Sequence, residues 1–324
     1  MKNLSNRTAT FTDSVIRRMT RVADQYGAIN LSQGFPDFNP PKEITDRLAQ
    51  VAAEGPHQYA VTFGAANFRE ALARKQEHFS GVPVDPDSEI VVTCGSTEAM
   101  ILCNPSNPCG KVFTKEELQI IADLAIKYDI YVITDEVYEH IVYAPNVHHY
   151  ISALPGMKER TIICNSLSKT YSITGWRLGY VIAAPEIIDR VKKVHDFLTV
   201  GAAAPLMEAA VVGLKFEDVY YKTIQETYTH KRELFLGGLE QIGLNFTRPQ
   251  GAYYVLMDIS EFGYEDDEQF CIDLAKKVGV AAVPGSSFFK EDVRHLVRLH
   301  FAKQDETLQK ALERLSDIHT AIQR

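Results

Sequence analysis

Short β-branched runs alternate with helical patterns in the middle third of the chain, and this alternation restricts the fold more than any other feature. The runs are Glu89–Thr93, Ile130–Thr134, Thr161–Asn165 and Gly179–Ala183. Apolar runs of this length are typical of strands buried on both faces. Strands that alternate with helices predict an α/β fold with a mostly parallel sheet.

Two segments between these runs have the apolar period of amphipathic helices. Thr114 and Glu117 have the spacing of a capping box, and the apolar period continues from there to Tyr128. The second helix follows Pro185, a residue that fits the first turn of a helix.

The length of 324 residues exceeds the size at which one hydrophobic core usually stops growing, and it predicts two domains. Beyond the middle third, the pattern indicates a long helical stretch, a helix near Asp267–Val278 and a strand within Val293–Ala302. We expect a large α/β domain at 40–215. We expect a smaller α/β domain at 216–324, to which an N-terminal arm at 1–39 contributes a part.

Composition and charge exclude several classes of protein. Apolar residues make up 45% of the chain and charged residues 23%, which excludes disordered, collagen-like and coiled-coil chains. The net charge of −8 predicts no nucleic-acid partner. No apolar stretch reaches the roughly 18 residues of a membrane span, and the N-terminal segment lacks a signal-peptide core, so we expect neither membrane association nor export. Five cysteines without a CxxC pair favour a reducing, cytoplasmic location.

Polar side chains follow three of the predicted strands, at Cys94–Glu98, Asp135–Tyr138 and Ser166–Lys169. Because ligands of an open α/β sheet bind beyond the carboxyl ends of its strands, we expect these clusters to converge at one edge. Gly95–Thr97 offers backbone N–H groups at a predicted helix N-terminus, where an anion can bind.

Lys169 lies among small hydroxyl residues, and Arg177 follows eight positions later. A lysine amine condenses with a carbonyl, while hydroxyl groups and arginine bind phosphate, so this cluster fits covalently held pyridoxal phosphate. Asp135 can keep a pyridine nitrogen protonated, and Tyr138 can hydrogen-bond the ring oxygen. From the residues alone, a lysine in a surface loop and a strand-end cap at Asp135 remain alternatives.

Three histidines, His140, His148 and His149, lie close together in a polar segment. They lack an ordered set of metal ligands in the sequence. We therefore expect them at a solvated surface, and we predict no metal site.

The spacing near residue 100 conflicts with a simple parallel sheet. Only a few residues separate the strand that ends at Thr93 from the next apolar run, Met100–Cys103. Parallel neighbours need a crossover of a dozen residues or more. We therefore predict that the two runs are not consecutive parallel strands and that a segment is missing between them.

Four motifs together resemble the class I and II aminotransferases, which are fold-type I pyridoxal-phosphate enzymes. They are Asn104–Lys111, Thr134–Glu139, Ser166–Arg177 and Arg298–Ala302, in the order seen in that family. The beginning, Ile29–Phe38, is most similar to the branch that holds kynurenine, glutamine, methionine and aspartate aminotransferases. The resemblance implies the fold-type I architecture, a pyridoxal 5'-phosphate cofactor and a homodimer.

The resemblance also implies roles for individual residues. Lys169 is the Schiff-base lysine and the base that moves a proton, while Asp135 pairs with the pyridine nitrogen. The ring oxygen is bound by Tyr138 and Asn107. The phosphate site comprises Gly95, Ser96, Thr97, Ser166, Ser168 and Arg177, together with Tyr59 of the neighbouring subunit. The substrate α-carboxylate is bound by Arg298, with the backbone of Gly34 and Asn107 nearby.

The chain departs from the family pattern between Met100 and Ile101. Relatives have a helix, a strand, an aromatic residue that stacks on the cofactor ring, and a further helix and strand here. Roughly two βα units of about 30 residues each are therefore absent. Cys109 also replaces a usual threonine. We expect the loss to uncover neighbouring apolar faces and to impair or abolish cofactor binding.

The expected function is transfer of the amino group of an L-amino acid to a 2-oxo acid by a ping-pong mechanism. One alternative is a cysteine-conjugate C–S β-lyase on the same scaffold, because the cofactor can also promote loss of a β-leaving group. The other is a truncated homologue that folds but does not turn over substrate.

Overall fold

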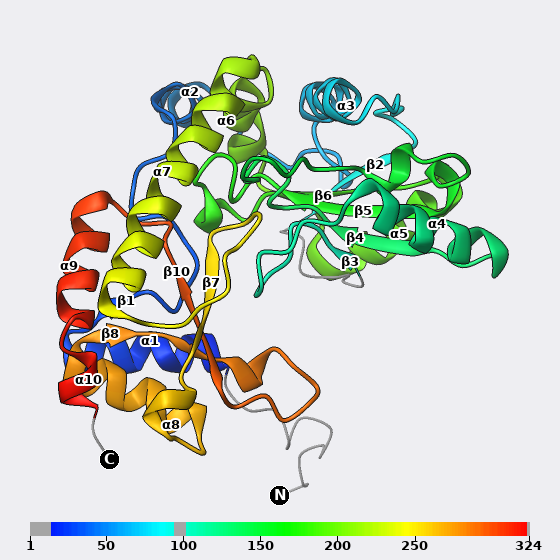
Figure 1. Cartoon of the computed structure of the whole chain (residues 1–324). Coiled ribbons are helices and arrows are strands. Elements are labelled where there is room, and N and C mark those ends of the chain that lie inside the picture. The colour runs from blue at the N-terminus through cyan, green and yellow to red at the C-terminus, as the bar shows by residue number, and fades with distance from the viewer. Residues whose placement is uncertain (1–13, 94–101, 323–324) are drawn as a thin grey trace, which may run out of the picture. The chain divides into compact units, whose positions relative to one another are not determined.

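The computed structural model describes residues 14–93 and 102–322, and the chain divides into two compact units (Figure 1). We call Phe35–His230 with Pro249–Ala252 the sheet unit. The small unit consists of Met1–Gly34, Lys231–Arg248 and Tyr253–Arg324. The domain boundaries expected at 39/40 and 215/216 stay predictions.

The sheet unit is built on five strands in the spatial order β2-β6-β5-β4-β3. The pairs β3–β4 and β4–β5 are parallel, while β6 is antiparallel to both β5 and β2. Four of the five strands therefore run in one direction, which confirms the mostly parallel sheet. The strands are β2 (Ile90–Thr93), β3 (Leu102–Cys103), β4 (Val132–Asp135), β5 (Thr161–Ser166) and β6 (Gly179–Ile182).

Helices cover both faces of this sheet. Ile90 and Val92 of β2 join a cluster with residues of α3 and α6, whereas Val91 joins a cluster with Ile188 of α5. Burial on both faces explains why the strand sequences are apolar without alternation. The helices are α2 (Lys42–Glu54), α3 (Ala66–Ser80), α4 (Lys115–Lys127), α5 (Pro185–Thr199) and α6 (Ala204–Leu214), with short 3₁₀ turns η2 (Ile151–Ala153), η3 (Lys158–Arg160) and η4 (Thr174–Trp176).

Helix α4 begins at the predicted capping box. The Thr114 hydroxyl accepts from the Glu117 N–H at 3.2 Å, and the Glu117 carboxylate accepts from the Thr114 N–H at 2.9 Å. One face packs Leu118, Ala122 and Ala125 into a buried cluster. Two of the four N–H groups that lack an acceptor within the helix are thus hydrogen-bonded to neighbouring side chains.

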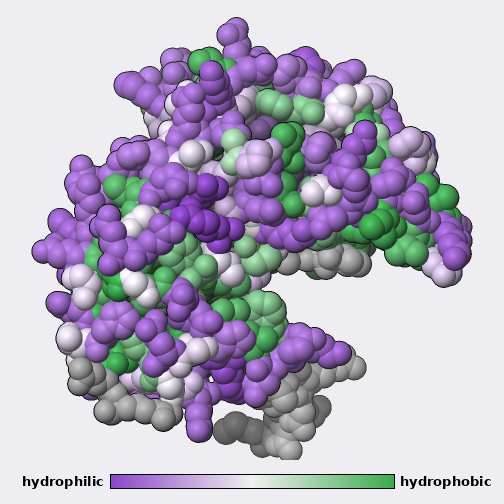
Figure 2. Space-filling model, in the orientation of Figure 1, coloured by the Kyte–Doolittle hydropathy of each residue, from purple (hydrophilic) through white to green (hydrophobic). Residues whose placement is uncertain are grey.

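Apolar side chains remain exposed on α4 and the segment that follows it. Figure 2 shows apolar surface on the side of the sheet unit where α4 lies. Exposed apolar groups of this size mark a surface that another segment or molecule covers. The residues are Ile120, Leu124, Ile126, Tyr128, Ile130 and Tyr131.

The two strands that flank residue 100 lie at opposite edges of the sheet. Strands β2 and β3 are separated by β6, β5 and β4, so they are not neighbours, as the spacing predicts. Four interstrand steps of about 4.8 Å place the edges about 19 Å apart. Met100 and Ile101 lie outside the described residues.

The small unit contains a three-stranded antiparallel sheet in the order β7-β10-β9, and a parallel pair β1–β8. Its strands are β1 (Ile29–Asn30), β7 (Tyr254–Asp258), β8 (Val280–Ala281), β9 (Val283–Pro284) and β10 (Leu296–His300). Its helices are α1 (Val15–Tyr26), α8 (Asp267–Asp273), the π-helical turn η6 (Leu274–Val278), α9 (Asp305–Leu315) and α10 (Ile318–Ala321), with 3₁₀ turns η5 (Ser260–Phe262) and η7 (Gly285–Ser287). The boundary between the units falls within α7 (Asp218–Ile242).

Within residues 14–93 and 102–322, no helix is both long and apolar enough to cross a membrane.

We expect Thr114→Ala to lower the free energy of unfolding by about 1 kcal/mol, because it removes the N-cap acceptor of α4. Urea denaturation measures this change. The matched control is Thr223→Ala, a threonine exposed on α7 that caps no helix start; we expect a change below about 0.5 kcal/mol there. Equal losses in the two variants would contradict a capping role.

Candidate active site

The turn after β4 presents Asp135 and Tyr138 at the carboxyl end of the sheet. Asp135 is the last residue of the strand and is buried. Its Oδ1 accepts from the Val137 N–H at 3.1 Å, which fixes the turn that follows. Tyr138 is also buried. The two side chains therefore come from one constrained turn.

Burial raises the pKa of the Asp135 carboxyl to about 6. The Val137 N–H lowers this pKa, the charge of Glu136 raises it, and the charge of Lys169 lowers it. A cation placed beside such a buried carboxyl stabilises its charged form, the carboxylate.

Lys169 follows β5, the parallel neighbour of β4. Its side chain is half-buried, and Nζ lies 6.0 Å from the centre of the Tyr138 ring. The charge of Lys169 also lowers the pKa of Asp135. The structure therefore brings Asp135, Tyr138 and Lys169 together.

Two buried hydroxyl groups precede Lys169. Ser166 Oγ lies 2.6 Å from Ser168 Oγ and accepts from the Ser168 N–H at 3.0 Å. Ser166 is the register partner of Gly179 in β6, and Arg177 comes two residues before that glycine. Arg177 is exposed, has a φ of +56°, and donates from Nη1 to the Thr174 carbonyl at 3.0 Å. The antiparallel pairing of β5 and β6 thus places the arginine at the same end of the sheet as the serines.

The loop that carries Asn107 begins beside Asp135. The Asn104 N–H donates to the Asp135 carbonyl at 3.0 Å, and the Asn104 side chain accepts from the Phe113 N–H at 3.1 Å. The Asn107 N–H donates to Cys103 Sγ at 3.4 Å. These bonds anchor both ends of the loop next to β4.

In the small unit, Arg298 of β10 is only 1% exposed. Its Nη2 donates to the Ser32 carbonyl at 3.0 Å. Its guanidinium carbon lies 4.2 Å from the centre of the Tyr254 ring and 4.5 Å from that of Phe288. Packing between two rings fixes the plane of the guanidinium, which is the condition for bidentate binding of a carboxylate.

Gly34 lies against Tyr253 and Tyr254. Its carbonyl accepts from the Tyr253 hydroxyl at 3.1 Å. A Cβ at this position would overlap the Tyr254 side chain, so only glycine fits without displacing it.

Some predicted site residues are not brought to these groups by the structure. The Tyr59 side chain is 90% exposed, and its contact with a neighbouring subunit stays a prediction. Gly95, Ser96 and Thr97 lie outside the described residues.

The expectation that the histidines lie at a solvated surface is wrong for His140 and His148. Each side chain is only 6% exposed. Both lie beside buried glutamates of the turn after β4: His140 beside Glu139, and His148 beside Glu136. Sequence reasoning missed these glutamates, although their position directly after a buried strand is a signal of burial.

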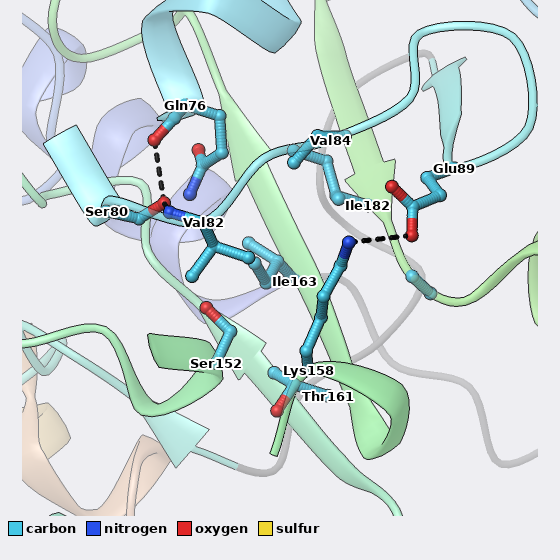
Figure 3. Close-up of a pocket in the computed structure, with 11 residues that line it drawn as sticks. Gln76, Ser80, Val82, Val84, Glu89, Ser152, Lys158, Thr161, Ile163 and Ile182 are labelled. Carbon is cyan, nitrogen blue, oxygen red and sulfur yellow. Dashed lines mark hydrogen bonds and ion pairs between the residues drawn. The ribbon is translucent and has the colours of Figure 1, made fainter. Parts of the chain in front are cut away.

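A small cavity lies elsewhere in the sheet unit (Figure 3). Gln76 and Ser80 of α3 and Ile163 of β5 line it, near the ion pair between Lys158 and Glu89. Its volume of about 20 Å³ fits about one water molecule, so it is too small for an amino acid. None of the predicted site residues lines it.

Known proteins resemble this chain over most of its length. The family profile for aminotransferase class I and II matches residues 26–100 and 96–315. Methionine aminotransferase of Escherichia coli strain K12 is 32% identical, with 94% of this chain and 96% of that protein covered. Aspartate aminotransferase of Pyrococcus abyssi is 29% identical, with 97% and 98% covered. The structure of N-succinyldiaminopimelate aminotransferase from Mycobacterium tuberculosis superimposes with a TM-score of 0.91 at 30% identity, covering 97% of this chain and 99% of that one.

The alignments also measure how much shorter this chain is. The alignment with the E. coli protein has 369 positions, although it includes only 94% of the 324 residues, or about 305. Roughly 64 of the 369 positions therefore have no counterpart in this chain. This number is equivalent to about two βα units. The family profile matches in two pieces that meet at residues 96–100, which locates the break at the predicted junction.

The superposition with solved aminotransferases confirms the fold-type I architecture that the motifs imply. The family consists of pyridoxal-phosphate-dependent aminotransferases. Profile, identity and fold agree, and the chain belongs to the class I and II aminotransferase family.

Proposed function

We propose that this protein binds pyridoxal phosphate in its sheet unit and transfers the amino group of an L-amino acid to a 2-oxo acid. The observation that carries the proposal is the placement of Asp135 and Lys169 at the ends of neighbouring parallel strands, with Tyr138 beside the lysine. When bound, the cofactor supplies an electron sink for negative charge at the substrate Cα.

The residues of the sheet unit fit this cofactor by their chemistry. Asp135 holds the ring nitrogen, because its buried carboxyl favours a cationic partner. Tyr138 and Asn107 bind the ring oxygen. The phosphate is bound by the hydroxyls of Ser166 and Ser168 and by the Arg177 guanidinium, which supply the hydrogen-bond donors that an anion needs.

Lys169 holds the cofactor before substrate arrives, and afterwards its free amine moves a proton from the substrate Cα. A half-buried amine near Asp135 suits this role, since it is reachable from solvent and yet positioned by the β5 turn.

Arg298 binds the α-carboxylate of the substrate. The amino-acid donor and the 2-oxo-acid acceptor both carry this carboxylate, so one arginine serves both halves of the reaction. The rings of Tyr254 and Phe288 hold the guanidinium plane for this purpose.

A second candidate is a homologue that binds ligands without turnover. It is favoured by the roughly 64 aligned positions that this chain lacks. The segment would include the aromatic residue expected to stack on the ring.

We expect wild-type protein supplied with pyridoxal phosphate to show the visible absorbance of the lysine-bound cofactor and to transaminate. In Lys169→Ala the band disappears and turnover falls by about 10²–10⁴-fold, because both the attachment point and the base are lost. Lys193→Ala, which changes an exposed lysine on α5, is the control and retains both.

Three outcomes separate the candidates in this experiment. A lysine-dependent band without turnover would favour the second candidate. Absence of the band in wild type would contradict cofactor binding, and unchanged turnover in Lys169→Ala would contradict the proposed mechanism.

The affinity for pyridoxal phosphate is expected to depend on the ionisation of Asp135. Above pH about 6 the carboxylate pairs with the protonated ring nitrogen. Below that pH the carboxyl takes up a proton, and affinity falls by up to about tenfold per pH unit. Titrations monitored by absorbance between pH 5 and pH 8 measure this step.

Asp135→Asn should bind the cofactor more weakly at pH 8 and should lack the step near pH 6. The control Asp123→Asn changes an exposed aspartate on α4 and should keep the wild-type pH dependence of cofactor affinity. The same pH profile in wild type and Asp135→Asn would rule out this role for the carboxyl.

We further propose that the protein forms a homodimer. The end of α5 supports this proposal, because Val194, Phe197, Leu198 and Val200 are exposed there. Contiguous exposed apolar groups of this kind are typical of protein interfaces.

Phe197 is 91% exposed, so Phe197→Asp should leave the fold intact and shift the protein towards monomer. Light scattering after size-exclusion chromatography measures the mass. Val219→Asp introduces the same charge at an isolated exposed valine of α7 and should remain dimeric. A monomeric wild type, or equal dissociation of both variants, would count against this interface.

A further inference from the structure

A second group of buried polar side chains follows β4, apart from the residues assigned to the cofactor. Glu136, Glu139 and His148 each place one ligand atom within 4.8 Å of the other two. The glutamate side chains are 2% exposed and the histidine side chain 6%. The proposed transamination uses none of the three.

The geometry between Glu136 and His148 is unusual for a hydrogen-bonded pair. Neither ring nitrogen of His148 nor Glu136 Oε2 has a hydrogen-bond partner among the described residues. Nε2 and Oε2 lie 3.8 Å apart, which is too long for a hydrogen bond. Two ligands bound about 2.1 Å from one tetrahedral ion lie about 3.4 Å apart, close to this separation.

The charges around the group also favour a cation. Lys75 Nζ lies 2.7 Å from one oxygen of Glu139, with His140 Nε2 3.2 Å from the same oxygen. The Tyr150 hydroxyl donates to the other oxygen at 2.7 Å. Lys75 therefore pairs with Glu139, while Glu136 Oε2 is buried without a hydrogen-bond partner among the described residues.

A route from solvent reaches the group. A pocket of about 360 Å³ is lined by Glu139, His140, His148 and Tyr150. An ion can enter through this pocket, and a water molecule in it can complete the coordination.

We propose that Glu136, Glu139 and His148 bind a divalent transition-metal cation, with Zn²⁺ as the best fit. An imidazole and two carboxylates form a donor set that Zn²⁺ accepts, whereas Mg²⁺ and Ca²⁺ prefer oxygen ligands alone. Each carboxylate oxygen has two lone pairs, so Glu139 can bind the ion and retain Lys75 and Tyr150. The ion would tie the His148 loop to the turn that carries Asp135 and Tyr138.

Calorimetric titration of ZnCl₂ into tag-free, chelator-treated full-length protein at pH 7.5 tests the site. We expect one Zn²⁺ per chain and a rise in melting temperature on binding. His148→Gln and Glu136→Gln should each weaken binding by about tenfold or more and abolish the rise. His149→Gln changes the neighbouring histidine, which is outside the group, and should behave as wild type.

Absence of Zn²⁺ binding to wild type would overturn the proposal. Equal affinity of wild type and His148→Gln would overturn it as well, since the ion would then bind elsewhere. If both glutamine variants fail to fold, the absorption spectrum of Co²⁺ bound to wild type decides. A tetrahedral nitrogen–oxygen spectrum supports the site, and an octahedral aquo-ion spectrum contradicts it.

Discussion

Burial of carboxyl groups at the end of β4 is the constraint on which the rest of the sheet unit depends. Asp135, Glu136 and Glu139 lie within five residues and are all buried. A buried carboxylate is stable only beside a compensating charge or hydrogen-bond donor. Glu139 is paired with Lys75 at 2.7 Å, whereas Asp135 accepts a hydrogen bond from the backbone N–H of Val137 at 3.1 Å. The turn is therefore built to receive positive charge, and this requirement links its structure to ligand binding.

Two interleaved pairs share this turn at the same spacing. Asp135 and Tyr138 form one pair. The charge of Lys169 lowers the pKa of Asp135, and its Nζ lies 6.0 Å from the centre of the Tyr138 ring. Glu136 and Glu139 form the other pair, and they meet Lys75 and histidines instead. The members of each pair are three residues apart, and both pairs share the backbone of one turn. A change that repacks one pair will therefore disturb the other through the shared backbone.

The strands β2, β4, β5 and β6 are predictable to within two residues, because burial on both faces leaves uninterrupted β-branched runs. The meeting of Asp135 with Lys169 is also predictable, since both follow strands of one parallel sheet. The burial of His148 is not predictable, because it depends on packing against Glu136, which lies twelve positions earlier in the sequence. Strand β3 has only two residues, too few for any periodicity.

The position of the missing segment divides the candidate site into two parts. Asp135 ends β4 and Lys169 follows β5, and each of these strands keeps a paired neighbour on both sides. Their support comes from strand pairing that the shortened chain retains. In the sequence, Gly95–Thr97 comes one residue after the end of edge strand β2 and adjoins the break. The end of the proposed site that we assign to the ring nitrogen therefore depends little on the lost segment, whereas one part of the proposed phosphate site, Gly95–Thr97, adjoins the break. We therefore expect the shortening to weaken the binding of the phosphate group more than that of the ring, because the predicted anion site at Gly95–Thr97 adjoins the break in the sequence.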